Sequence, residues 1–230
     1  MYRLPNYLLF IVFSFSSVIG QDSERRTLTT GAFHGIKVYS KIEINLIPSE
    51  ANKAIVTGEN KDAVVISLRN KILRIKLETE SFLSPQKTKI DLYHTQPLDL
   101  IEANQGVRIE SPQPLKQASV SLIAKRGAVI ELELDTERTD VSTAMGGRVM
   151  MHGKTNALSI TATSGSSCEA ENLSLPQAKV KLWGGGYAYI APTILLDAQV
   201  YGGSVLRVYS DPRKQITQKA LSGKIYFENK

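Results

Sequence analysis

The chain of 230 residues is poor in the residue types that build disulfides, metal sites and thiol active sites. Its one cysteine, Cys168, cannot form an internal disulfide. The three histidines, His34, His94 and His152, lie far apart and lack the spacing of metal ligands. Cys168 has no obvious histidine partner that would activate a thiolate. We therefore predict no metal, no cofactor and no catalytic residue.

Runs of like charge are also missing. Lysine and arginine number 28 against 22 aspartates and glutamates, a formal net charge of +6, and the charges are dispersed. A nucleic-acid-binding protein usually gathers its basic residues into a patch or stripe. The dispersed pattern predicts no nucleic-acid partner.

One long apolar run is present, at residues 8–19, behind Arg3 and ahead of a charged stretch at residues 22–26. Twelve residues are too few to span a bilayer, and small residues follow them, as in a cleaved secretory signal. We predict a signal peptide at residues 1–20 and an exported mature chain, in the periplasm or at the cell surface or outside the cell. No later run is apolar enough to cross a membrane, so we predict no integral membrane segment after cleavage.

A sustained 3.6-residue period is absent as well, which argues against helices. Residues 31–100 instead alternate with period two, most cleanly where Leu73, Ile75 and Leu77 are separated by charged residues. Turn-forming stretches separate these runs. The alternation predicts an all-β protein that begins with a β-meander at residues 27–100.

Glycine, in contrast, is regularly placed: in residues 101–230 it recurs at steps of 18 to 21 residues. The segments include "NQGVRI" (104–109), "WGGGYA" (183–188) and "YGGSVL" (201–206). Seven glycines align as predicted turn positions: Gly106, Gly127, Gly147, Gly165, Gly185, Gly203 and Gly223. A unit of this length cannot bury its apolar side alone, so units stack as rungs. We predict a β-solenoid of about seven rungs, a right-handed parallel β-helix, with residues 21–230 as one domain; a β-sandwich is the alternative.

The segment "WGGGYAY" (183–189) is one of these corners and lacks the pattern of a phosphate-binding loop. Its aromatic residues are not explained by the repeat. Trp183 and Tyr201 fall on adjacent rungs, and Tyr187 and Tyr189 follow the same corner. These four residues are either a surface that stacks on sugar rings or an aromatic ladder in the core.

Acidic residues offer a weaker candidate site. Glu131, Glu133 and Asp135 alternate with aliphatic residues in "IELELDTE" (130–137). Paired carboxylates can hydrolyse glycosidic bonds, which here would require Glu102, Glu131 and Glu133 to converge in a groove. Acid–aliphatic alternation is, however, typical of any half-exposed strand.

The chain resembles a known family. The resemblance rests on the segments "FHGIKVYSKIEINLIPSE", "AIVTGENKDA" and "NKILRIKL", which are followed by Ser-Gly or Gly-Gly about every 20 residues. These segments are similar to the auto-transporter adhesin head domain with a GIN motif, a family of exported bacterial proteins of Bacteroidetes type. The resemblance covers roughly residues 30–228 and implies a β-helical or solenoid-like fold. It implies no catalytic residues, because the family supplies none.

Three functions remain open at this point. The first is a non-enzymatic binding or adhesion module that contacts a cell-surface glycan or an envelope protein through one solenoid face. The second is a structural envelope component whose end rungs pair with another protein or with further copies of the chain. The third is a carbohydrate-active enzyme. The location of Trp183 and Tyr201, on the surface or in the core, distinguishes the first from the second.

Overall fold

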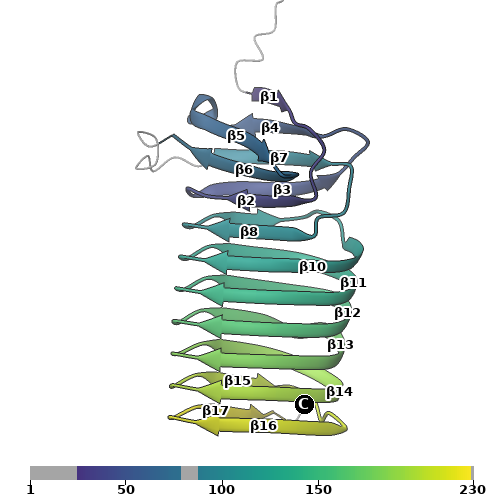
Figure 1. Ribbon diagram of the computed structural model, residues 1–230, viewed down its shortest axis with the longest axis vertical. Coiled ribbons are helices and arrows are strands. Elements are labelled where there is room, and N and C mark those ends of the chain that lie inside the picture. Colours follow the sequence, from purple (N-terminus) through teal and green to yellow (C-terminus); the bar gives the residue numbers. More distant parts are fainter. Residues whose placement is uncertain (1–24, 79–87, 229–230) are drawn as a thin grey trace, which may run out of the picture.

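The protein is a β-solenoid whose strands stack along one long axis (Figure 1). The computed structural model describes residues 25–78 and 88–228. The predicted signal peptide lies outside the described residues. Strands dominate the fold, which makes about seven solenoid turns, as the glycine repeat predicts. Its neighbouring rungs pair in parallel, whereas the strands of a β-sandwich pair antiparallel, so the sandwich alternative is wrong.

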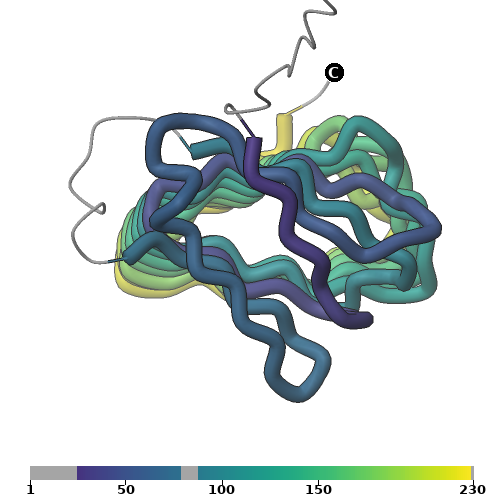
Figure 2. The backbone as a smooth tube through the Cα atoms, turned by 90° about the horizontal axis from the view of Figure 1, so that it is seen from above, coloured from purple at the N-terminus to yellow at the C-terminus, as the bar shows by residue number. Residues whose placement is uncertain are grey.

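Each rung of the repeat region is one long strand that bends at its middle. The strands are β10 (Leu115–Lys125), β11 (Val129–Ala144), β12 (Arg148–Thr163), β13 (Ser167–Trp183) and β14 (Tyr187–Tyr201). In β11 the bend lies near Glu137, between the paired positions Thr136 and Arg138. The halves before the bend form one sheet, sheet A, and the halves after it form a second sheet, sheet B. Each rung therefore contributes one strand segment to each face of the solenoid (Figure 2).

The N-terminal strands extend both sheets. They are β1 (Arg25–Thr29), β2 (Gly35–Val38), β3 (Ile42–Pro48), β4 (Lys53–Thr57), β5 (Val64–Arg69), β6 (Ile72–Leu77), β7 (Thr88–His94), β8 (Leu100–Asn104) and β9 (Arg108–Glu110), with a short 3-10 helix η1 at Lys61–Ala63. Sheet A runs in the order β1, β4, β7, β3, β9 and then β11. Sheet B runs β5, β6, β2, β8 and then β10.

This order corrects the predicted meander at residues 27–100. A meander pairs each strand with the next in sequence, but among these strands only β5 and β6 do so. Strands β2 and β3 instead insert between later strands, in parallel with β6, β8, β7 and β9. The N-terminal region thus adds parallel rungs to the solenoid and closes them with antiparallel edge strands.

The two ends of the solenoid differ. At the N-terminal end, the Arg26 guanidinium donates hydrogen bonds to the backbone carbonyls of Lys61, Asp62 and Val64, which ties β1 to η1 and β5. The C-terminal end is formed by β15 (Val205–Val208), β16 (Lys214–Ala220) and β17 (Lys224–Phe227). In the described part of the chain, β16 pairs with β14 alone, and every residue of β16 is exposed.

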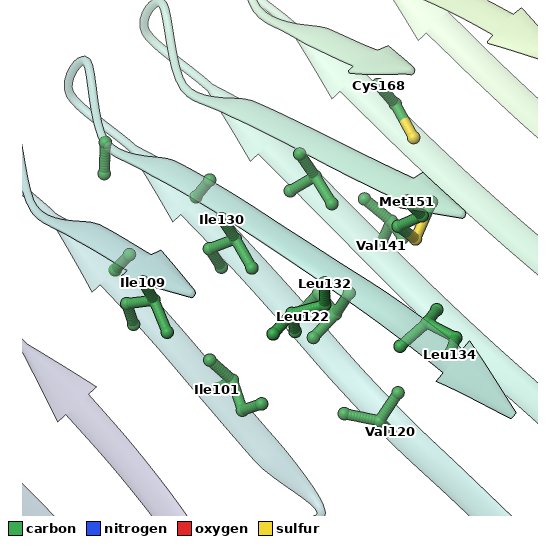
Figure 3. Packing of buried hydrophobic residues seen from close by; sticks show 14 of the residues in the cluster. Ile101, Ile109, Val120, Leu122, Ile130, Leu132, Leu134, Val141, Met151 and Cys168 are labelled. Atoms are coloured by element: carbon green, nitrogen blue, oxygen red, sulfur yellow. The ribbon is translucent and has the colours of Figure 1, made fainter. Parts of the chain in front are cut away.

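A single apolar cluster fills the space between the sheets, from Phe33 in the N-terminal region to Val208 in β15. It arises because alternate side chains of each strand point inward. Figure 3 shows Ile109, Ile130 and Cys168 on different rungs of this interior. Parallel register stacks Ile130 on Val149 and Val149 on Cys168, so one apolar column continues from rung to rung. Cys168, the one cysteine of the chain, is buried in this column.

The corners that join sheet B to sheet A are turns of two residues with positive φ. The pairs are Gln105–Gly106, Arg126–Gly127, Met145–Gly146, Ser164–Gly165, Gly184–Gly185, Gly202–Gly203 and Leu221–Ser222. Glycine suits the second position because it adopts positive φ without steric cost. Two predicted turn glycines, Gly147 and Gly223, lie one residue after the turn. Gly147 occupies a tight contact instead: a Cβ there would lie 2.1 Å from the carbonyl oxygen of Ala124.

Candidate functional site

The three glycines of "WGGGYAY" each have a structural reason. Gly184 and Gly185 form the turn pair, with φ of 58° and 79°. Gly186 lies against the rung before it, where a Cβ would meet the carbonyl oxygen of Ala162 at 2.2 Å. The glycine content of this corner therefore serves the fold, and its aromatic residues are left as the candidate site.

Trp183 and Tyr201 lie side by side on the outer surface of sheet B. Trp183 ends β13 and pairs in register with Thr163, and the pairing of Leu182 with Val200 places Tyr201 beside Trp183 on the next rung. The Trp183 side chain is 60% exposed. The Tyr201 hydroxyl donates a hydrogen bond of 3.1 Å to Oε1 of Gln218, which orients its ring. These two residues are not a core ladder.

Tyr187 and Tyr189 lie beyond the corner on the outer surface of sheet A. Tyr187 is 39% exposed and stands between Ser167 and Val205 of the neighbouring rungs. Tyr189 stands between Glu169 and Arg207. The four predicted aromatics therefore form two pairs on opposite sides of one corner, and no single ligand face contains them all.

Two lysines share the outer surface of sheet B with Trp183. Lys179 and Lys181 precede Trp183 at intervals of two residues, and both are exposed. The neighbours of Lys181 on the adjoining rungs are Thr161 and Gln199, both uncharged. Neither lysine forms an ion pair within residues 25–78 and 88–228. The sequence "KVKLW" (179–183) could have predicted this arrangement. Val180 and Leu182 are apolar and point inward, so both lysines and the tryptophan, which alternate with them, must point outward.

A hollow of about 350 Å³ continues this surface toward the bend of the rungs. It is lined by Arg138, Ala157, Leu158, Ser159, Gln177, Ala178, Lys179, Leu195 and Asp197. Lys179 belongs both to the hollow and to the row of outward residues that ends at Trp183. The Arg138 guanidinium is engaged by the Asp140 carboxylate at 2.8 and 2.9 Å. The aromatic pair, the two lysines and the hollow together form one strip across sheet B, which we call the aromatic–lysine strip.

A larger hollow, about 560 Å³, lies among the loops that follow β3, β7 and β9. Pro48, Pro97 and Pro114 line it together with His94. Burial lowers the pKa of His94 despite the opposing hydrogen bond between its Nδ1 and the carbonyl oxygen of Gln96. Among the described residues, its Nε2 has no hydrogen-bond partner. Sequence reasoning missed this hollow because three separate loops build it.

The acidic residues of the enzyme hypothesis do not converge. Glu131 and Glu133 point outward from sheet A, where Glu131 accepts a bond of 2.7 Å from Arg108 and Glu133 lies 3.7 Å from Nε2 of His152. Glu102 belongs to β8 in sheet B, beyond the corner. Burial alone would raise the pKa of Glu102, but hydrogen bonds from Lys37 and Asn104 and the positive charges of Lys37 and Lys125 outweigh it and lower the pKa. This carboxylate is a structural partner of lysines.

A family model described as "Putative auto-transporter adhesin, head GIN domain" matches residues 32–212. The chain belongs to this family. The match spans both the N-terminal rungs and most of the repeat region, in agreement with the resemblance seen in the sequence. No curated protein sequence matches the chain.

Solved structures with the same fold come from Bacteroides and Parabacteroides species. A crystal structure named as a putative adhesin of Bacteroides fragilis is 16% identical, with a TM-score of 0.79 over 89% of this chain and 96% of that one. A second putative adhesin, of Parabacteroides merdae, is 18% identical with a TM-score of 0.71 over 89% and 95% of the two chains. A putative lipid-binding protein of Parabacteroides distasonis is 15% identical, with a TM-score of 0.64 over 90% and 96%. At these identities the likeness shows the fold of the GIN-domain family.

Two further properties of this GIN-domain chain concern metals and membranes. Within the described residues, no group of three or more histidine, cysteine, aspartate or glutamate side chains is placed to hold a metal ion. Burial raises the pKa of the Cys168 thiol well above its ordinary value, with smaller contributions from Glu169 and Glu171. In the same part of the chain, no helix is long and apolar enough to span a bilayer.

Proposed function

We propose that this GIN-domain protein is an exported, non-enzymatic binding module of the adhesion type, and that it contacts glycans through the outer surface of sheet B. The observation that carries the proposal is the exposure of Trp183 beside Tyr201. Large aromatic side chains are mostly buried, and a tryptophan exposed over more than half of its surface requires a reason.

The aromatic pair has the geometry of a stacking surface. Neighbouring strands lie roughly 4.8 Å apart, so two rings on adjacent rungs offer a continuous apolar area. The hydrogen bond from Tyr201 to Gln218 orients one ring before any ligand arrives, which reduces the entropy lost on binding. Sugar rings present apolar C–H faces that can stack on such a surface. The family description and the neighbours named as putative adhesins agree with an adhesion-type role.

A second candidate function is a structural role in the cell envelope, through pairing of the last rung with another protein. It is favoured by the C-terminal end, where β16 is exposed along its whole length and Leu221 is 80% exposed. An exposed strand edge can pair with a further strand.

The test is a binding screen of the exported chain against a broad panel of glycans and envelope polysaccharides. The double variant Trp183→Ala/Tyr201→Ala is compared with Tyr187→Ala/Tyr189→Ala, which removes the aromatic pair of sheet A. We expect the first variant to lose at least about tenfold in affinity and the second to bind like the natural protein. Unfolding midpoints of both variants are measured first, to verify that each is folded.

Four results decide between the functions. Loss of binding in the sheet B variant alone supports the proposal, whereas loss in the sheet A variant alone moves the site to Tyr187 and Tyr189. Cleavage of any bound polysaccharide contradicts the non-enzymatic role. If no glycan binds, the proposal fails and pairing through β16 becomes the leading function.

A further inference from the structure

The charge around Trp183 differs from the charge around the other aromatic pair. On sheet A, Tyr189 lies between Glu169 and Arg207, and each of these is already in an ion pair, with Arg148 and Glu228 respectively. The two charged neighbours of Tyr189 are therefore compensated locally. On sheet B, Lys181 stands two residues from Trp183 with uncharged neighbours on both adjoining rungs.

An uncompensated lysine beside an aromatic platform favours a negatively charged ligand. Residues i and i+2 of a strand point to the same face and lie roughly 7 Å apart. The flexible side chain of Lys181 can therefore reach a group held over Trp183. Lys179 repeats the charge one step further along β13, at the edge of the hollow. Asp197 is the neighbour of Lys179 on the next rung, and it is the one acidic residue that lines the hollow.

We propose that the aromatic–lysine strip binds an anionic glycan, one whose sugar rings carry carboxylate or sulfate groups. A ring of this glycan stacks on Trp183 and Tyr201, and its acidic group lies at the ammonium group of Lys181. The chain then continues along β13 past Lys179 into the hollow. This inference rests on the proposed function and specifies the chemical class of the glycan.

The experiment compares charged and uncharged forms of the same polysaccharide. The carboxylate arm uses polygalacturonate and its methyl ester, and the sulfate arm uses dextran sulfate and dextran. Binding to the full chain is measured by titration calorimetry at low and at high ionic strength. Lys181→Gln removes the proposed contact, and Lys76→Gln is the matched control, an exposed lysine in β6 at the far end of the same sheet.

We expect the charged form to bind more tightly than its uncharged form in at least one arm. Lys181→Gln should weaken that binding by about two- to fivefold at low salt, the range of one exposed ion pair, while Lys76→Gln leaves it unchanged. Added salt should reduce the preference for the charged form. The arm that responds identifies the acidic group as carboxylate or sulfate.

Other results overturn the inference in recognisable ways. Equal affinity for the charged and uncharged forms removes the anionic preference but leaves glycan binding intact. An equal loss in Lys181→Gln and Lys76→Gln, with Trp183→Ala still binding, indicates diffuse attraction to a basic protein and no site. A chain that binds none of the four polysaccharides, nor any glycan in the wider screen, contradicts both the inference and the proposed function.

Discussion

The two outer faces of the solenoid are built from the same rungs, yet they differ in how their charges are arranged. On sheet A, basic and acidic residues meet across neighbouring strands, as in Arg108 with Glu131 at 2.7 Å and Lys154 with Asp135 at 3.2 Å. On the C-terminal half of sheet B, Lys179 and Lys181 share a face with an exposed tryptophan and form no ion pair within the described residues. A repeat that fixes the inward residues leaves the outward residues free to vary, so each face can acquire its own chemistry.

The largest effect is expected where the two faces meet, at the corner after Trp183. Gly186→Ala places a Cβ against the Ala162 carbonyl oxygen, and the backbone at this contact must shift. We expect a loss of about 3 kcal/mol in the free energy of unfolding, measured by urea denaturation.

Gly203→Ala is the control for that corner. Its φ is +72°, but no atom lies within 4 Å of the added Cβ, so we expect about 1 kcal/mol from backbone strain alone. Equal losses in the two variants would contradict a role for close contact between the rungs.

An intermediate effect on stability is expected at Glu102, whose carboxylate pairs with Lys37 and Lys125 on sheet B. Glu102→Gln should cost about 1–3 kcal/mol, because Lys37 at 2.9 Å loses its buried partner. Since the folded pKa of Glu102 is lowered, its stabilisation exists above the pKa of an unfolded glutamate and is lost as the pH falls through the folded pKa. Between neutral and acidic pH, the urea midpoint should fall less in Glu102→Gln than in the natural protein. An equal fall in the two proteins would contradict this prediction.

The smallest effects on stability are expected when one charged residue is replaced on each face. Arg108→Gln on sheet A removes exposed ion pairs with Glu110 and Glu131 and should cost at most about 1 kcal/mol, less in high salt. Lys181→Gln on sheet B should leave the unfolding midpoint unchanged, because it breaks no ion pair within the described residues. A stability loss in Lys181→Gln would reveal a partner and weaken the contrast between the faces.

The all-β solenoid was predictable because its signals are local. Alternation fixes which residues of a strand point inward, and the spacing of glycines fixes the length of a rung. The phase of Val180 and Leu182 could also have placed Trp183 on the surface. The turn register was ambiguous where glycines are adjacent, at Gly146 and Gly147, and in the last rung, where Leu221 and Ser222 form the turn without glycine.

The features of the fold and of the candidate site that the sequence did not predict depend on contacts between distant segments. Strand β2 pairs in parallel with β6 and β8, and nothing in its own four residues specifies those partners. The hollow near Lys179 is likewise assembled from four rungs, β11 to β14, which only the stacking register brings together. The charge contrast between the two aromatic pairs could not be predicted either, because it depends on which residues become lateral neighbours.

Because the two ends of the solenoid differ, we expect it to unfold from one end, the C-terminal one. Each rung is held by its two neighbours, but within the described part of the chain β16 and β17 pair on one side alone. Strand β1, in contrast, is tied by Arg26 to η1 and β5. Local opening should therefore begin at the C-terminal rung and proceed upward one rung at a time. Amide hydrogens should exchange with solvent fastest in β16 and more slowly in each rung toward the N-terminal region. Trp183, two rungs above the open edge, would then report early unfolding by its fluorescence, before the N-terminal rungs separate.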